Sequence, residues 1–389
     1  MPVLIRSGLT FSQPFRSTRL PSSRFVHTSL SVNSLCASGQ VELTSRALIS
    51  LTGQDASHFL QGLTTANIPP SPGSSPGSIY SVFLNAQGRI LHDVFVYPLP
   101  TSSALLHAAS SQVTRREAEP TYLIEVDSAE IQGLIKWLKK YKLRSKICLR
   151  ALDPGEIRVL SAWSDSDSIM VSETFDQSQL ITVDSRAPSF STRVLVASAE
   201  KPKLDLPLVS EDIYRFRRYL WGIPEGQTEL LHSTALVHDY CVDYMNGVDF
   251  RKGCYVGQEL VIRTQHTGVV RKRVLPCVIY RDGELPPNPN LLKMDYEIGT
   301  EIHRGTDIEK VEAQTERRQR SCGKWIAGVG NVGLALCRLE EMVGIGPGGE
   351  RSNTWNQSRE FKLALDIKPS NINVRVKALL PKWWKKNDP

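Results

Sequence analysis

The chain has 389 residues, of which 41% are hydrophobic and 22% charged, and its formal net charge is +7. This length supports two or three globular domains, and no apolar run approaches the roughly 20 residues of a membrane-spanning helix, which excludes membrane insertion. Four arginines lie in the first 41 residues, and the +3 that remains without them is too weak to indicate nucleic-acid binding.

Residues 1–41 have the composition of an organelle leader. They hold twelve Ser or Thr and four Arg but no acidic residue, which is typical of a mitochondrial transit peptide. We therefore expect import into the mitochondrial matrix. The alternative interpretation is a disordered N-terminus without a targeting signal.

The first elements of the predicted fold form a small mixture of strands and helices. Residues 44–53 predict a strand and residues 55–60 a helical stretch. Two further strands, at 79–84 and 90–97, are joined by a short polar turn and so predict a hairpin, which places Asp93 in its second strand. A strand at 122–126 and a helix at 128–142 follow.

The later elements predict a change toward β structure. Strands are expected at 146–151, 157–162 and 193–196, followed by a basic helix at 210–219 that begins at Ser210. From residue 272 onward, short β-rich runs at 272–280, 328–336 and 374–379 predict a small C-terminal β domain. Two polar stretches, 305–322 and 343–366, are interpreted as inserted loops outside its core.

The chain contains seven cysteines, and none of them belongs to a C-x-x-C pair. This number and spacing indicate neither a disulfide framework nor a structural zinc site, which suits a reducing compartment.

One cysteine, Cys254, lies in the octapeptide Lys252-Gly253-Cys254-Tyr255-Val256-Gly257-Gln258-Glu259. A thiol acts as a nucleophile or metal ligand only as the thiolate, and a neighbouring cation such as Lys252 or Arg251 favours that form. Glycines on both sides let the backbone adopt unusual angles or approach another molecule. The alternative is a simple turn with Cys254 packed as a small hydrophobic residue. We favour the functional interpretation.

The neighbours of Cys254 have two interpretations each. Lys252 and Arg251 either lower the pKa of the thiol or are solvated surface cations, and Tyr255 either covers the thiol or anchors the loop. Gln258 and Glu259 can hold the loop through hydrogen bonds to its backbone. Four basic residues that follow either form a docking face for an acidic partner or a solvated strand: Arg263, His266, Arg271 and Arg273.

The octapeptide and its surroundings resemble the signature of the YgfZ/GcvT family, and more narrowly its mitochondrial iron-sulfur cluster assembly branch of the CAF/Iba type. The resemblance includes the runs 244–250, 263–268 and 271–273 around the octapeptide. It extends to residues 83–89 with Asp93, to 122–127, and to 330–335 and 381–384. The aminomethyltransferases of glycine cleavage share the fold of this family but not the cysteine motif.

The resemblance implies an α+β fold, a three-domain cloverleaf of the glycine-cleavage T-protein type with a C-terminal β-barrel. It places a discontinuous folate-binding-like domain at 42–98 plus 205–265, a second domain at 99–204 and the barrel domain with its inserted loops at 266–389. The implied function is the maturation of 4Fe-4S proteins together with A-type iron-sulfur carriers, by a factor that is non-catalytic or weakly catalytic, although members of the family are often labelled aminomethyltransferases. Cys254 would then ligate a transient cluster shared with the partner, since clusters are normally held by four ligands.

A second hypothesis is a tetrahydrofolate-dependent aminomethyl or one-carbon transferase, in which Asp93, Asp239 and Arg263 bind folate. The chain departs from the family here, with Val237-His238-Asp239 in place of a Pro-x-Glu step and His92-Asp93 in place of paired acids. These departures weaken the transferase hypothesis, because its chemistry needs carboxylates to manage protons.

His232, His238 and His266 are additional candidate iron ligands.

Overall fold

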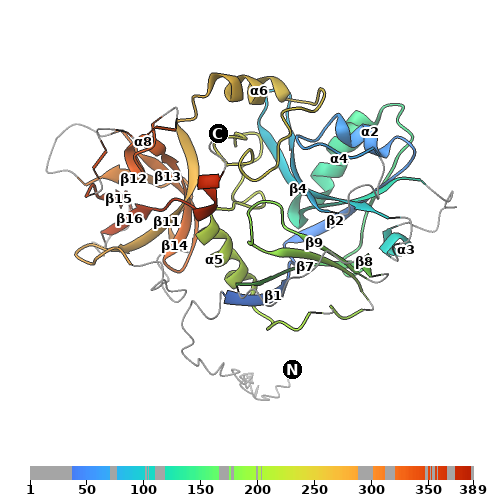
Figure 1. The fold of residues 1–389 in the computed structure, drawn as a ribbon, viewed down its shortest axis with the longest axis horizontal. Coiled ribbons are helices and arrows are strands. Elements are labelled where there is room, and N and C mark those ends of the chain that lie inside the picture. Colours follow the sequence, from blue (N-terminus) through green and yellow to red (C-terminus); the bar gives the residue numbers. More distant parts are fainter. Residues whose placement is uncertain are drawn as a thin grey trace, which may run out of the picture.

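The structure is a computed structural model that describes residues 37–70, 77–100, 103, 105–109, 119–165, 175–176, 179–198, 200–202, 204–287, 301–311, 320–346, 349–350, 352, 355–356, 358–365 and 373–386. Its strands form two open five-stranded sheets and one closed barrel. The barrel lies at one end of the molecule and the two open sheets at the other, with helices between and around them (Figure 1). No helix within the described ranges is long and apolar enough to cross a membrane.

The first sheet has the strand order β3-β4-β5-β2-β6, and all its neighbours are antiparallel. Its strands are β2 (Arg46–Thr52), β3 (Ile79–Leu84), β4 (Ile90–Leu99), β5 (Thr121–Asp127) and β6 (Cys148–Ala151). Every residue of β4 is buried, because the sheet is covered on both faces. One cover consists of the helices α2 (Ala56–Gln61) and α4 (Ile131–Lys142), the latter preceded by the 3₁₀ turn η1 (Ser128–Glu130).

The second sheet has the order β1-β7-β10-β9-β8 and is also antiparallel. Its strands are β1 (Ser38–Glu42), β7 (Ile157–Ser164), β8 (Phe175–Asp176), β9 (Gln179–Val183) and β10 (Thr192–Ala197). Apolar side chains of β4, such as Phe95 and Tyr97, belong to one core cluster with Val159 of β7 and Leu195 of β10. The two open sheets therefore share a buried layer.

The strand pairing crosses the expected domain boundaries. Residues 121–151, assigned to the second domain, pair with β2 and β4 and belong to the first sheet. Residues 38–41, assigned to the leader, form most of β1 and pair with β7. Both pairings join segments distant in sequence, which local patterns cannot reveal. The rest of the leader, residues 1–36, lies outside the described residues.

The barrel closes in the order β11-β14-β13-β12-β15-β16, with β16 pairing back to β11. Its strands are β11 (Lys272–Arg281), β12 (Asp307–Lys310), β13 (Gly323–Val329), β14 (Val332–Arg338), β15 (Phe361–Leu363) and β16 (Val374–Ala378). Short helices follow β14 and β16, namely α8 (Leu339–Met342) and η3 (Lys382–Lys386).

The expected C-terminal β domain is confirmed, but two of its details are wrong. The single strand predicted at 328–336 is a hairpin that turns at Gly330 and Asn331 between β13 and β14. The stretches 305–322 and 343–366 contain β12 and β15, so they are not only inserted loops. Both strands are short and bury few residues, which makes their sequences read as polar.

Helix α5 (Glu211–Trp221) joins the barrel to the open sheets. It contacts β11, β13 and β14 of the barrel as well as β1 of the second sheet. It carries two acids in its first turn, where the helix dipole favours negative charge. The predicted basic helix is confirmed, but two of its arginines, Arg217 and Arg218, are buried.

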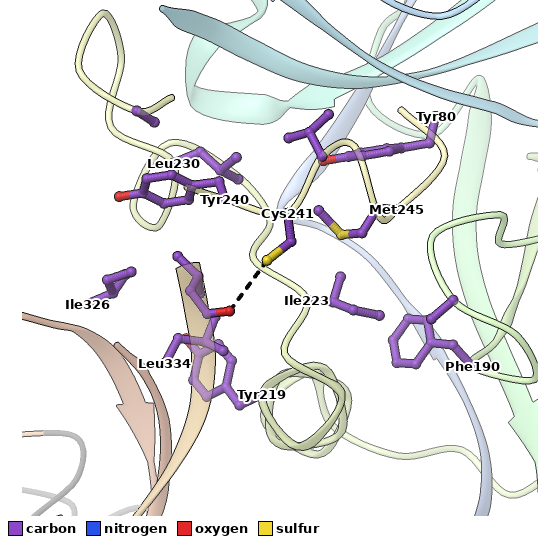
Figure 2. Close-up of a cluster of buried hydrophobic side chains, with 14 of the residues drawn as sticks. Tyr80, Phe190, Tyr219, Ile223, Leu230, Tyr240, Cys241, Met245, Ile326 and Leu334 are labelled. Atoms are coloured by element: carbon purple, nitrogen blue, oxygen red, sulfur yellow. Dashed lines mark hydrogen bonds between the residues drawn. The ribbon is translucent and has the colours of Figure 1, made fainter. Parts of the chain in front are cut away.

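An apolar core fills the junction of these parts (Figure 2). Tyr80 of β3, Tyr219 of α5 and Leu334 of β14 surround Cys241 and Met245 of the loop that leads toward the octapeptide. The Cys241 thiol donates to the carbonyl of Val274 at 3.5 Å, and burial raises its pKa to about 12. Cys241 is therefore a packing residue, held as the neutral thiol.

Candidate functional site

The octapeptide forms a loop that leads directly into helix α6 (Gln258–Thr267), at the upper edge of the view in Figure 1. Sequence reasoning missed this helix. Gly257 is its N-cap and has φ +80. A Cβ there would lie 2.3 Å from the backbone oxygen of Asn85, in the β3–β4 turn. The approach is equally close from the side of the turn, because a Cβ on Gly88 would lie 2.9 Å from the oxygen of Gly257. The octapeptide is thus docked on the first sheet through two glycines.

Cys254 is exposed, and so is Gly253, which has open space around it. Among the described cysteines, Cys241, Cys277, Cys322 and Cys337 are buried, whereas Cys148 of β6 is exposed. The thiol of Cys254 is accordingly accessible to another molecule, as its predicted role requires.

Lys252 anchors the loop. Its Nζ donates to the backbone oxygens of Thr64 and Ala66 at 2.7 and 2.8 Å, and it lies 5.2 Å from the centre of the Tyr255 ring. Burial lowers the pKa of this ammonium to about 8. The hydrogen bonds of Lys252 are therefore made to the main chain that precedes β3, and they hold the loop in place.

Tyr255 is the buried counterpart of the exposed thiol. Its side chain is 7% exposed and belongs to the main core, and burial raises its pKa to about 12. Its backbone N–H donates to Oε1 of Gln258 at 3.2 Å, which confirms the expected hydrogen bond from Gln258 to the loop. Glu259 is exposed in the first turn of α6, where its negative charge interacts favourably with the positive end of the helix dipole. A buried Tyr255 and a Gln258 bonded to its backbone thus hold the loop beside the exposed Cys254.

The expected basic docking face is only partly present. Arg263 and His266 are exposed on α6, and Arg271 is exposed beyond it. Arg273, in contrast, is buried in a bidentate ion pair with Asp243, with both distances 2.8 Å, and lies 3.8 Å from the Tyr244 ring centre. Its assignment to an exposed face is wrong, because it ties β11 to the preceding loop.

Asp93 belongs to a buried network of ions between the two open sheets. It accepts from Arg46 at 3.2 Å and from the backbone N–H of Gly226 at 3.1 Å, and burial raises its pKa against the influence of Arg46. Arg46 also bonds Glu125 at 2.8 Å. At the centre, Glu225 accepts from Arg186 at 2.7 Å and Arg193 at 2.6 Å. Although burial opposes it, these arginines hold the pKa of Glu225 well below its usual range.

The network borders a cavity of about 420 Å³ between the first sheet, α5 and the barrel. Arg46, Asp127, Arg218 and Glu225 contribute to its lining, together with Ile326 of β13. Sequence reasoning did not identify this cavity, because its walls come from the first sheet, α5 and the barrel, and its arginines resemble surface charges.

The three predicted folate ligands do not lie together. Asp93 is sealed in the ion network, while Asp239 lines a separate pocket of about 180 Å³ beside α6, along with His238. Burial raises the pKa of Asp239 and lowers that of His238. Arg263 is exposed on α6. The two pockets therefore give these three residues no common site.

Among the candidate histidines, His232 lies beside His92 and Glu130. The ring centres of His92 and His232 are 5.3 Å apart. Burial lowers the pKa of His92 to about 4. Sequence reasoning treated His92 as a departure from a carboxylate and did not consider Glu130. No local pattern links residues so distant in the chain.

Comparison with known proteins first gives the class of the fold. An aminomethyltransferase T of the glycine cleavage system from Bartonella henselae has a TM-score of 0.58 and 14% identity, with 90% of this chain and 88% of that one covered. Residues 271–386 match the family described as CAF17, C-terminal beta-barrel domain. The chain thus has the α+β fold of the glycine-cleavage T-proteins, with a closed six-stranded C-terminal barrel, as expected.

Curated relatives identify the branch. The mitochondrial iron-sulfur cluster assembly factor IBA57 homolog of Chaetomium globosum is 43% identical over 380 residues, covering 90% of this chain and 84% of that protein. The same-named protein of Neurospora crassa is 41% identical over 394 residues, covering 94% and 86%. That of Coccidioides immitis is 43% identical over 365 residues, covering 89% and 83%. The chain belongs to the IBA57 family of mitochondrial iron-sulfur cluster assembly factors.

Proposed function

We propose that this protein acts in the mitochondrial matrix to mature 4Fe-4S proteins, and that the Cys254 thiolate ligates a cluster shared with an A-type carrier. The cluster is cargo, which the protein holds in passing and does not keep as a cofactor. The observation that carries the proposal is the exposed thiol of Cys254 in an otherwise anchored loop.

The surroundings of Cys254 support a shared site. A cluster needs four ligands, mostly thiolates. Within the described part of the chain, the only group of three or more His, Cys, Asp or Glu side chains spaced for a metal does not include Cys254. The remaining ligands would come from the partner, and the exposed position of Cys254 leaves room for them.

The anchored loop supports transfer as well as binding. Lys252, Gly257 and Gln258 fix the backbone on both sides of the thiol. The loop therefore loses its conformational entropy when the protein folds, and not when the cluster binds. The exposed cations of α6, Arg263 and His266, are placed to attract an acidic carrier.

Anaerobic reconstitution tests the proposal. Iron content and the visible absorption of a cluster are measured for the protein mixed with an A-type carrier, using wild type, Cys254→Ser and the matched control Cys148→Ser. We expect wild type and the control to form the mixed species and Cys254→Ser to lose it. In mitochondria, Cys254→Ser should lower aconitase-type activity. A Cys254→Ser protein that assembles the mixed cluster normally would refute the proposal.

A second proposal is that tetrahydrofolate binds to the chain, as a one-carbon transferase would require. The cavity of about 420 Å³, with Arg46, Arg215 and Arg218 in its lining, supports it, because folate carries an anionic glutamate tail. Calorimetry with tetrahydrofolate tests it. Arg215→Gln should weaken binding, since Arg215 is half-exposed and its ion pair with Asp212 is at the surface, whereas Cys254→Ser should not. Absence of binding to wild type would refute it.

A further inference from the structure

Three potential metal ligands from distant parts of the sequence meet beside the first sheet. His92 comes from β4, Glu130 from the turn η1 and His232 from the loop after α5. One ligand atom of each, a ring nitrogen or a carboxylate oxygen, lies within 4.8 Å of the other two. A tetrahedral metal ion with bonds of about 2.0–2.2 Å holds its ligand atoms roughly 3.4 Å apart, so binding would draw these side chains together by up to about 1.4 Å.

His232 is oriented as a metal ligand would be. Its Nδ1 lies 3.1 Å from the carbonyl oxygen of Leu91, and because a carbonyl only accepts, Nδ1 must carry the proton. In the neutral imidazole, the other nitrogen, Nε2, then keeps its lone pair. Metal-binding histidines typically donate their second ring N–H to a carboxylate or a backbone carbonyl, which fixes the tautomer and the ring orientation.

His92 supplies a second, independent observation. Its residue is 1% exposed, and its Nδ1 is buried without a hydrogen-bond partner in the part of the chain that the structure describes. An unsatisfied buried polar atom of this kind costs about 1–3 kcal/mol. A cation bound at Nδ1 of His92 would satisfy this atom and remove the cost.

The local charge favours a cation. Glu130 is half-buried, and Asp127 lies close enough for its charge to act on His92. Both carboxylate oxygens of Asp127 accept backbone N–H groups, from Ala129 at 3.0 Å and Gln227 at 2.8 Å, so this charge is fixed in position.

We propose that His92, Glu130 and His232 bind one divalent first-row transition-metal ion, of the kind that two imidazoles and one carboxylate prefer, such as Fe²⁺ or Zn²⁺. Three protein ligands leave further positions for water or another molecule. The site does not use Cys254, so it is separate from the shared cluster and does not depend on the proposed function.

Cobalt binding to the purified full chain tests this site. Co²⁺ gives a visible spectrum whose bands distinguish nitrogen and oxygen ligands from thiolate ligands, and the affinity is obtained by titration; Fe²⁺ is then tested anaerobically by competition. We expect one Co²⁺ bound without a thiolate band. Cys254→Ser should bind it equally, which separates this site from the cluster proposal.

Two variants and one control make the test specific. His232→Ala removes an exposed ligand and should weaken Co²⁺ binding by at least the roughly 10- to 100-fold that loss of an outer-shell partner costs, whereas the surface variant His303→Ala should not weaken it. Gly133→Ala is a second route, because its Cβ would lie 3.0 Å from Oε2 of Glu130 and crowd the carboxylate, while alanine favours the helix. This variant should fold as well as wild type and bind Co²⁺ more weakly. Wild-type affinity in His232→Ala, or no Co²⁺ binding by wild type, would overturn the proposal.

Discussion

The replacement of Gly257 by alanine is the most direct test of how the octapeptide is held. Gly257 has φ +80, and its Cβ would lie 2.3 Å from the oxygen of Asn85 and 2.9 Å from Cβ of Leu84. The oxygen of Asn85 belongs to the backbone and also accepts the N–H of Gly88 at 2.9 Å. It cannot move without opening the β3–β4 turn.

The two costs of Gly257→Ala are separable. A left-handed backbone costs an alanine about 1–2 kcal/mol, and overpacking against a fixed neighbour costs a further 1–3 kcal/mol or so. We therefore expect the free energy of unfolding to fall by about 2–5 kcal/mol. Gly253→Ala is the control in the same loop, because Gly253 has open space and no positive φ, and it should change stability by no more than about 0.5 kcal/mol.

Urea unfolding of both variants gives the comparison, and cluster reconstitution with a carrier gives its functional counterpart. Gly257→Ala should also lower the cluster yield, since the loop carrying Cys254 is displaced from its support. Equal stability loss in the two variants, or none in Gly257→Ala, would show that the loop is not docked as described.

Two further perturbations address the anchor and the ion network. Lys252 has a pKa of about 8 in the folded chain and about 10.5 when unfolded, so the unfolded chain binds more protons between these values. Stability should therefore rise with pH across this window in wild type relative to Lys252→Met, and parallel pH profiles of the two unfolding free energies would refute this. Glu225→Gln leaves the arginines Arg186 and Arg193 without their shared carboxylate. It should cost about 3–5 kcal/mol in the same unfolding assay, and a loss below 1 kcal/mol would contradict the network's role.

The sequence predicted the elements whose signals are local. The β3–β4 hairpin, α4 with its apolar face and the C-terminal barrel strands β11 and β16 all follow from periodicity and turns. The chemistry of the octapeptide was recognisable because a thiol, two glycines and a lysine lie close together in the chain. The sequence did not show that Lys252 donates to the backbone oxygens of Thr64 and Ala66.

Features made by distant residues could not be predicted. Arg186, Arg193 and Arg218 look like surface charges, and only the packing of the two open sheets shows that each is buried with a carboxylate partner. The same applies to His92, Glu130 and His232, which three separate elements bring together. Strands such as β12 and β15 were missed because they are only four and three residues long.

The closure of the barrel has a consequence for interrupted synthesis. Strand β16 ends at Ala378, close to the end of the chain, yet it pairs with both β11 and β15. A premature stop codon shortly before residue 374 would therefore leave two neighbouring strands with unpaired backbone groups, which are templates for association between chains. Such a product would be expected to precipitate or be degraded by quality-control proteases, even though it retains the whole octapeptide.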